Sequence, residues 1–109
     1  MSGQMNAAVI HLLCKTRDYV FFNFVIIMER KDFISRLDAL IWRPSAVNER
    51  EISALLDLCP AEDIPEIRHF VNIQKGMGEQ WEQSVILRRR GLDVTCRCRL
   101  IDSLLVARI

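Results

Sequence analysis

The chain has 109 residues, of which 50% are hydrophobic and 27% charged, and its net charge is +1. This composition is typical of a globular domain and excludes a disordered chain, and the length suits one domain with a single core. Four glycines and three prolines are too few for the many tight turns of an all-β domain. We therefore predict a mainly α fold, a small irregular bundle of about five helices. An α+β fold with an N-terminal hairpin is the alternative.

Charge is distributed unevenly along the sequence. Residues 44–83 contain eight acidic and three basic side chains, whereas residues 84–109 contain six basic and two acidic ones. This pattern predicts pairing between complementary faces, either within the fold or between subunits, or else a basic tail that binds phosphates.

The sequence also indicates a compartment. Its four cysteines occur without a recognisable secretory signal, so we expect reduced thiols in a cytoplasmic protein. The longest apolar run, residues 19–28, is about half of a membrane span, and none is predicted.

The first part of the chain is predicted to be an apolar arm. Apolar residues at helical spacing suggest a short helix over residues 5–13. Residues 19–28 are rich in aromatic and β-branched side chains and could form a strand paired with residues 7–14, or a buried helix capped by Asp18. We favour the helix, because the rest of the chain is helical. Met28 opens a typical amphipathic segment, so residues 1–27 are predicted as the arm and residues 28–109 as a helical domain.

Two helices are predicted next. Residues 29–42 place apolar side chains on one face, and Pro44 should end that helix. Residues 48–59 begin with Asn48, a favourable N-cap, and Glu51 can complete a capping box. Their apolar stripe comprises Ile52, Leu55, Leu56 and Cys59, and Pro60 ends the helix.

A third helix should begin after Asp63, with Pro65 in its first turn and Glu66 at the capping-box position. Its stripe comprises Ile64, Ile67, Phe70 and Val71, and we expect Gly76 and Gly78 to end it.

The C-terminal part is predicted to contain a helix over residues 79–90, with Trp81 and Val85 facing inward. Three arginines would occupy its last turn and Gly91 would follow as the C′ residue. The final stretch alternates like a strand from Val94 to Leu100. It also fits a helix begun at Asp93, which we favour; that helix would bury Val94, Cys98, Ile101 and Leu105.

Metal binding is one function to weigh. His11, Cys14, Cys96 and Cys98 could together supply four nitrogen and sulfur ligands. The two pairs, His11 with Cys14 and Cys96 with Cys98, both depart from the usual C-x-x-C motif of structural zinc sites. We therefore interpret the cysteines as small buried hydrophobic residues. We predict no metal and no other cofactor.

Nucleic-acid binding is the second possibility. Arg88, Arg89, Arg90, Arg97 and Arg99 could form a patch that contacts phosphates. Arginines at helix ends are more commonly solvated or ion-paired, so this hypothesis is not the favoured one.

Catalysis has the weakest support. Neither His11 nor His69 lies in a recognisable catalytic motif. Glu66, Arg68 and His69 could be drawn as an acid/base cluster, but a histidine on a charged helix face is the better interpretation. We predict that the chain has no catalytic residues and is not an enzyme.

Protein recognition is the remaining class. Tryptophan and arginine are common anchors of interfaces, so Trp42, Arg43 and Trp81 are the candidate partner-binding residues, although core positions suit both tryptophans. We predict a non-catalytic helical interaction or regulatory module that binds a protein partner or forms a homo-oligomer. A small nucleic-acid-binding transcriptional regulator is the alternative.

Overall fold

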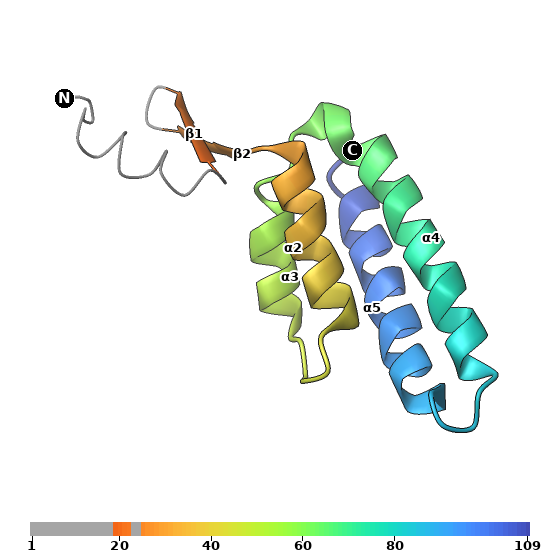
Figure 1. The fold of residues 1–109 in the computed structure, drawn as a ribbon. Helices are drawn as coiled ribbons and strands as arrows, with labels where there is room; N and C mark the ends of the chain where they lie inside the picture. The colour runs from red at the N-terminus through yellow and green to blue at the C-terminus, as the bar shows by residue number, and fades with distance from the viewer. Residues whose placement is uncertain (1–18, 23–24) are drawn as a thin grey trace.

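The computed structural model of the chain describes residues 19–22 and 25–109, and Figure 1 shows its fold. The prediction of a mainly α fold is confirmed, although the described part contains four α-helices where about five were expected. The first predicted helix, residues 5–13, lies outside the described residues. The helices are α2 (Arg30–Trp42), α3 (Glu49–Leu56), α4 (Ile64–Glu82) and α5 (Arg88–Val106), with a 3-10 turn η2 (Ala61–Asp63) before α4.

Two short strands precede the helices. β1 (Tyr19–Phe22) and β2 (Val25–Met28) pair in antiparallel fashion, with Val20 opposite Ile27. The preference for a helix over residues 19–28 was therefore wrong, because this segment forms a hairpin of its own. The run is dominated by β-branched and aromatic residues, which favour an extended backbone. Residues 7–14, the strand partner that the sequence suggested, lie outside the described residues.

The core lies where the four helices meet. α4 and α5 form a long antiparallel pair with the most extensive helix interface, and the shorter α2 and α3 pack beside them (Figure 1). Every helix contributes side chains that are almost completely buried: Phe33, Leu37 and Ile41 from α2, Ile52 and Leu56 from α3, Ile64, Ile67 and Val71 from α4, and Val94, Cys98, Ile101 and Leu105 from α5. The predicted stripes therefore face one shared core. No helix in the described ranges is both long and apolar enough to cross a membrane.

The N-terminus of α3 forms the predicted capping box. The Asn48 side chain accepts a hydrogen bond from the Glu51 N–H at 2.9 Å, and the Glu51 carboxylate accepts one from the Asn48 N–H at 3.3 Å. The carboxylate also binds Arg43 through two nitrogens. Hydrogen bonds from Arg43 and then from the Asn48 backbone lower the pKa of Glu51. The cap thereby ties the start of α3 to the end of α2.

Removing this cap should weaken the domain measurably. We expect Asn48→Ala to lower the free energy of unfolding by about 1 kcal/mol, because an N–H at the helix start loses its acceptor. Urea denaturation followed by circular dichroism measures the change. Ser45→Ala is the control, because the exposed Ser45 lies outside the cap, and it should change the stability little. Equal stability of Asn48→Ala and the unmodified chain would contradict the role of the cap.

The start of α4 differs from the prediction in one respect. Pro65 does lie in the first turn, but Asp63 makes no side-chain cap. Its backbone is helical, at φ −89° and ψ −9°, because η2 leads directly into α4, and an N-cap requires an extended backbone. Asp63 and Glu66 instead accept hydrogen bonds from Arg30 at 2.9 and 2.7 Å. The predicted capping box is therefore replaced by an ion-pair cluster with α2.

The glycines expected to end α4 lie inside it. The helix passes through Gly76 and Gly78 and continues to Glu82, although glycine costs up to about 1 kcal/mol relative to alanine inside a helix. Gly78 is buried against α5, where an added Cβ would meet Val94 and Thr95 at 2.8 to 3.0 Å. Tertiary packing against α5 therefore overrides the local preference of glycine for a helix end.

The predicted helix over residues 79–90 was also wrong. Residues 83–87 form the turn between α4 and α5, and Arg88 begins α5. The three arginines therefore occupy a first turn, where the dipole does not favour cations, and Gly91 is an interior residue of α5. Val85, predicted to face inward, is 96% exposed. The strand alternative for residues 94–100 fails as well, because α5 runs through them.

Candidate interaction surface

The connection between α4 and α5 presents apolar side chains to solvent. Val85 and Ile86 are 96% and 89% exposed, and Leu87 and Leu92 are also exposed. We call Val85, Ile86, Leu87, Arg88 and Arg89 the apical loop; it lies at the end of the helical bundle away from the C-terminus (Figure 1). Apolar side chains so fully exposed are unfavourable in water, so this adjacent pair makes the connection the candidate interaction surface.

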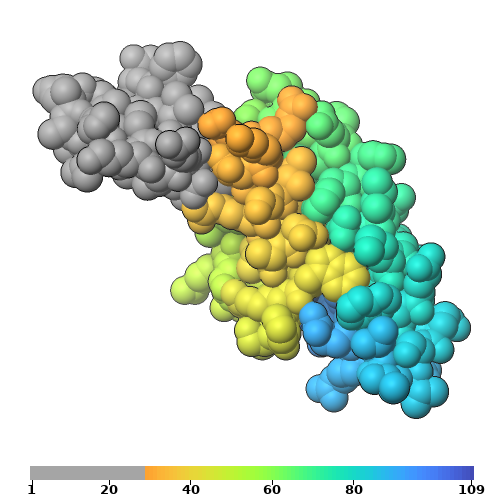
Figure 2. All heavy atoms as spheres, viewed as in Figure 1, coloured from red at the N-terminus to blue at the C-terminus, as the bar shows by residue number. Residues whose placement is uncertain are grey.

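The backbone at the base of the apical loop is hydrogen-bonded. The Gln83 N–H donates to the Gln80 carbonyl at 3.1 Å, and the Ser84 N–H donates to that of Trp81 at 3.0 Å. The Ser84 hydroxyl then accepts a bond from the Leu87 N–H at 3.3 Å. The turn therefore holds Val85 and Ile86 outward on an ordered backbone. In the space-filling view, the end of α4 and the start of α5 project at the lower right (Figure 2).

The five predicted arginines do not form one patch. Arg88 and Arg89 are exposed beside the apolar part of the apical loop, and neither has an acidic partner in the described part of the chain. Arg90 instead donates to the Trp42 carbonyl at 2.6 Å and lies 5.9 Å from the centre of the Trp81 ring. Arg99 is exposed on α5, in a hollow between α4 and α5.

Arg97 has a structural position that the sequence did not reveal. One of its guanidinium nitrogens lies 3.0 Å from the Ile41 carbonyl and 2.7 Å from that of Arg43, and the other lies 3.0 Å from that of Ser45. These acceptors are at the C-terminal end of α2, where carbonyls lack helical partners and the dipole favours a cation. Arg97 and Arg90 therefore cap α2 from α5. Both hydrogen-bond within the fold, so fewer donors remain for a phosphate backbone.

The predicted partner-binding residues all make contacts within the fold. Trp42 and Trp81 pack edge to face with their ring centres 4.8 Å apart, and the Trp42 indole N–H donates to the Gln74 side chain at 2.8 Å. Arg43 forms its ion pair with Glu51. All three side chains are partly buried, so they join α2, α3 and α4. Their use as anchors for a partner remains a prediction.

The cysteines separate on the two faces of α5. Cys96 is exposed and Cys98 is buried in the core, so one ion could not bind both without distortion of the helix. His11 and Cys14 lie outside the described residues. Within the described ranges, no three His, Cys, Asp or Glu side chains gather closely enough to hold a metal ion.

Thiol alkylation should distinguish these cysteines. Burial raises the pKa of Cys98 to about 12 and that of Cys59 to about 11, which lowers the fraction of reactive thiolate. In the folded protein at pH 8, we expect Cys96 to react with iodoacetamide at least about tenfold faster than either. Peptide mass spectrometry measures each site. Similar rates at Cys96 and Cys98 without denaturant would contradict the burial of Cys98.

The residues drawn as a possible acid/base cluster have different partners. Glu66 binds Arg30, and Arg68 binds Asp102 on α5 at 2.8 Å. His69 is exposed on α4. The three side chains therefore do not share a hydrogen-bonded network.

Sequence reasoning missed the exposed apolar pair of the apical loop. Val85 and Ile86 fall in the helix predicted over residues 79–90, because the three arginines and Gly91 fit the end of a helix. The clue was a short apolar run between Gln83-Ser84 and three arginines, with Gly91 closely following. The fold defines a small, mainly α protein, with four α-helices in the part of the chain that the structure describes. No family model, no curated protein and no solved structure among those compared matches this chain.

Proposed function

We propose that this chain is a non-catalytic interaction or regulatory module that binds a protein partner through its apical loop. The observation that carries the proposal is the exposure of Val85 and Ile86, at 96% and 89%, on a hydrogen-bonded turn. An ordered backbone loses less conformational entropy on binding than a flexible loop does, so it suits a docking surface.

The chemistry of the apical loop specifies the partner. Its apolar centre suits an apolar hollow, and the exposed Arg88 and Arg89 beside it suit a rim of carboxylates. In such an interface the apolar contact supplies most of the affinity, while the arginines fix orientation and speed the encounter. The partner is therefore an acidic protein surface with an apolar depression, presented in the cytoplasm.

Paired variants test this proposal. The double variant Val85→Ser/Ile86→Ser removes the apolar centre, and Ile109→Ser changes a residue of similar exposure, 80%, elsewhere. Each form is immobilised and exposed to native cell extract, and bound proteins are quantified by mass spectrometry. We expect a defined protein that the unmodified chain and Ile109→Ser retain equally and the double variant loses. Light scattering on the same three forms shows whether a second copy is that partner. Identical binding profiles and oligomeric states for all three forms would contradict the proposal.

A nucleic-acid-binding regulator is the competing hypothesis. It would rely on Arg88, Arg89 and Arg99, because Arg90 and Arg97 hydrogen-bond to α2. Binding to bulk DNA that weakens steeply with salt, and that Arg88→Ala/Arg89→Ala abolishes, would favour it over a protein partner.

A further inference from the structure

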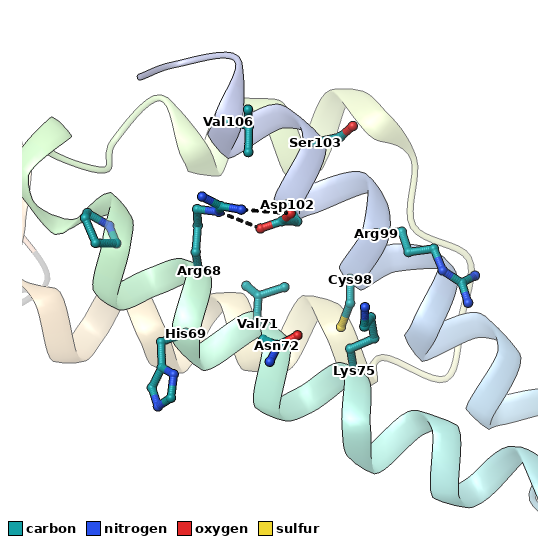
Figure 3. Close-up of a pocket in the computed structure, with 11 residues that line it drawn as sticks. Arg68, His69, Val71, Asn72, Lys75, Cys98, Arg99, Asp102, Ser103 and Val106 are labelled. Carbon is teal, nitrogen blue, oxygen red and sulfur yellow. Dashed lines mark hydrogen bonds and ion pairs between the residues drawn. The ribbon is translucent and has the colours of Figure 1, made fainter.

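A hollow of about 530 Å³ lies between α4 and α5, separate from the apical loop. Figure 3 shows it in close-up, with Arg68, Asn72 and Lys75 on the α4 side and Arg99 and Asp102 on the α5 side. Its volume falls within the range of small-molecule sites, and its lining is mixed in polarity. The hollow is therefore large enough for a small ligand and offers polar groups from both helices.

The hollow carries an excess of positive charge. Arg68 and Asp102 neutralise each other across it, with the Arg68 Nε atom 2.8 Å from one Asp102 oxygen (Figure 3). Lys75 and Arg99 come from opposite walls, and neither has an acidic partner in the described residues. Both cations line the same hollow, so an anion bound there would be attracted by two positive charges.

Lys75 lies within the hollow. It is partly buried, and Figure 3 shows its ammonium group close to Cys98, a core residue that also lines the hollow. Burial raises the pKa of Cys98, and the charge of Lys75 partly opposes that rise, as expected for neighbours. A partly buried cation is screened less by salt than an exposed one, so it attracts an anion more strongly.

We infer that the hollow between α4 and α5 binds a small anion that carries phosphate. Lys75 supplies a point charge and Arg99 a planar set of donors, which together suit phosphate oxygens. The Asn72 amide is a further donor on the α4 side. Arg68 is paired with Asp102, so these two side chains together add no net charge to the hollow. The ligand class is a free phosphate, a pyrophosphate or the phosphate end of a nucleotide.

Titration of the full chain with three probes tests this inference. Inorganic phosphate, pyrophosphate and adenosine diphosphate are added at constant ionic strength, with sodium chloride as the reference, and amide shifts are followed by NMR. We expect saturable shifts at residues 68–75 and 98–103, and tighter binding of pyrophosphate than of phosphate. Adenosine diphosphate that binds more tightly than pyrophosphate identifies a nucleotide site; equal or weaker binding identifies a site for the phosphate groups alone.

Single variants assign the binding to the hollow. Lys75→Gln and Arg99→Gln should each weaken pyrophosphate binding roughly tenfold, the effect of losing one charge-assisted hydrogen bond. Arg50→Gln, on the exposed surface of α3, is the charge-matched control and should leave the affinity unchanged. Asp102→Asn removes the opposing negative charge and should tighten binding, a gain that partial unfolding could not mimic. Shifts no larger than those caused by sodium chloride, or equal affinities in Lys75→Gln and Arg50→Gln, would overturn the inference.

Discussion

Replacing Gly91 with alanine is expected to lower the free energy of unfolding by about 3 kcal/mol, the upper part of the range for overpacking. An added Cβ would lie 2.6 Å from both the Glu82 nitrogen and the Gly78 oxygen, and 2.9 Å from the Trp81 carbonyl carbon. All three are backbone atoms of α4, so no side-chain rotation can relieve the clash. The two helices would have to separate at this contact.

The other two glycines of the α4–α5 pair provide graded controls. Gly78→Ala would meet the side chains of Val94 and Thr95, which can adjust, so we expect a smaller loss of about 1 kcal/mol. Gly76→Ala meets no atom within 4 Å and should stabilise the helix by about 0.5 to 1 kcal/mol. Urea denaturation of the three variants gives the order. Gly91→Ala as stable as Gly76→Ala would rule out the close contact between α4 and α5.

Replacing Arg97 with methionine should cost about 2 kcal/mol of stability, because several carbonyls at the end of α2 lose a charged donor at once. Methionine keeps much of the aliphatic length, so the loss reports mainly on the guanidinium. Arg97→Lys should recover only part of the stability, since a single ammonium cannot reach acceptors on both sides of the fork. Thermal and urea unfolding of the variants measure both effects.

Arg99→Met is the matched control for Arg97. Arg99 lies two residues further along α5, is exposed, and has no hydrogen-bond acceptor in the described part of the chain. The free energy of unfolding of the Arg99→Met variant should therefore change by less than about 0.5 kcal/mol. Equal losses from Arg97→Met and Arg99→Met would show that general charge, and not the cap on α2, accounts for the effect.

The features predicted correctly from the sequence are those that local rules decide. The capping box of Asn48 and Glu51 needs only three residues of spacing, and it forms as expected. The predicted inward face of the last helix, Val94, Cys98, Ile101 and Leu105, is buried in full. Helical periodicity therefore identified most of the core. An apolar helix face must be buried against some other helix, so its residues can be predicted without knowing which helix covers them.

The errors arise where tertiary packing overrides a local preference. Gly78 looks like a helix end, yet it lies within α4 because α5 needs room at that point. Once α4 extends to Glu82, the turn moves to residues 83–87 and the arginines change from a last turn to a first turn. Residues 19–28 were ambiguous for another reason: a short apolar run has no period that separates a buried helix from a hairpin.

The candidate surfaces were predicted less well than the fold. The acidic partner of Arg68, Asp102, and the acceptors of Arg97 are each more than 30 residues away in sequence, so only the assembled fold brings them together. The same packing decides which arginines cap α2, namely Arg90 and Arg97, and which are exposed, namely Arg88, Arg89 and Arg99. Exposure of Val85 and Ile86 could be recognised only after the turn between α4 and α5 had been placed.

Photo-crosslinking from the apical loop tests the proposed function most directly. A photoreactive phenylalanine analogue replaces Ile86 in one form and the exposed Ala54 of α3 in the control form, and both are irradiated in cells. We expect position 86 to yield a discrete crosslinked protein that position 54 does not yield, and Arg88→Glu/Arg89→Glu to reduce it. The same weak, diffuse products from both positions would contradict binding through this loop.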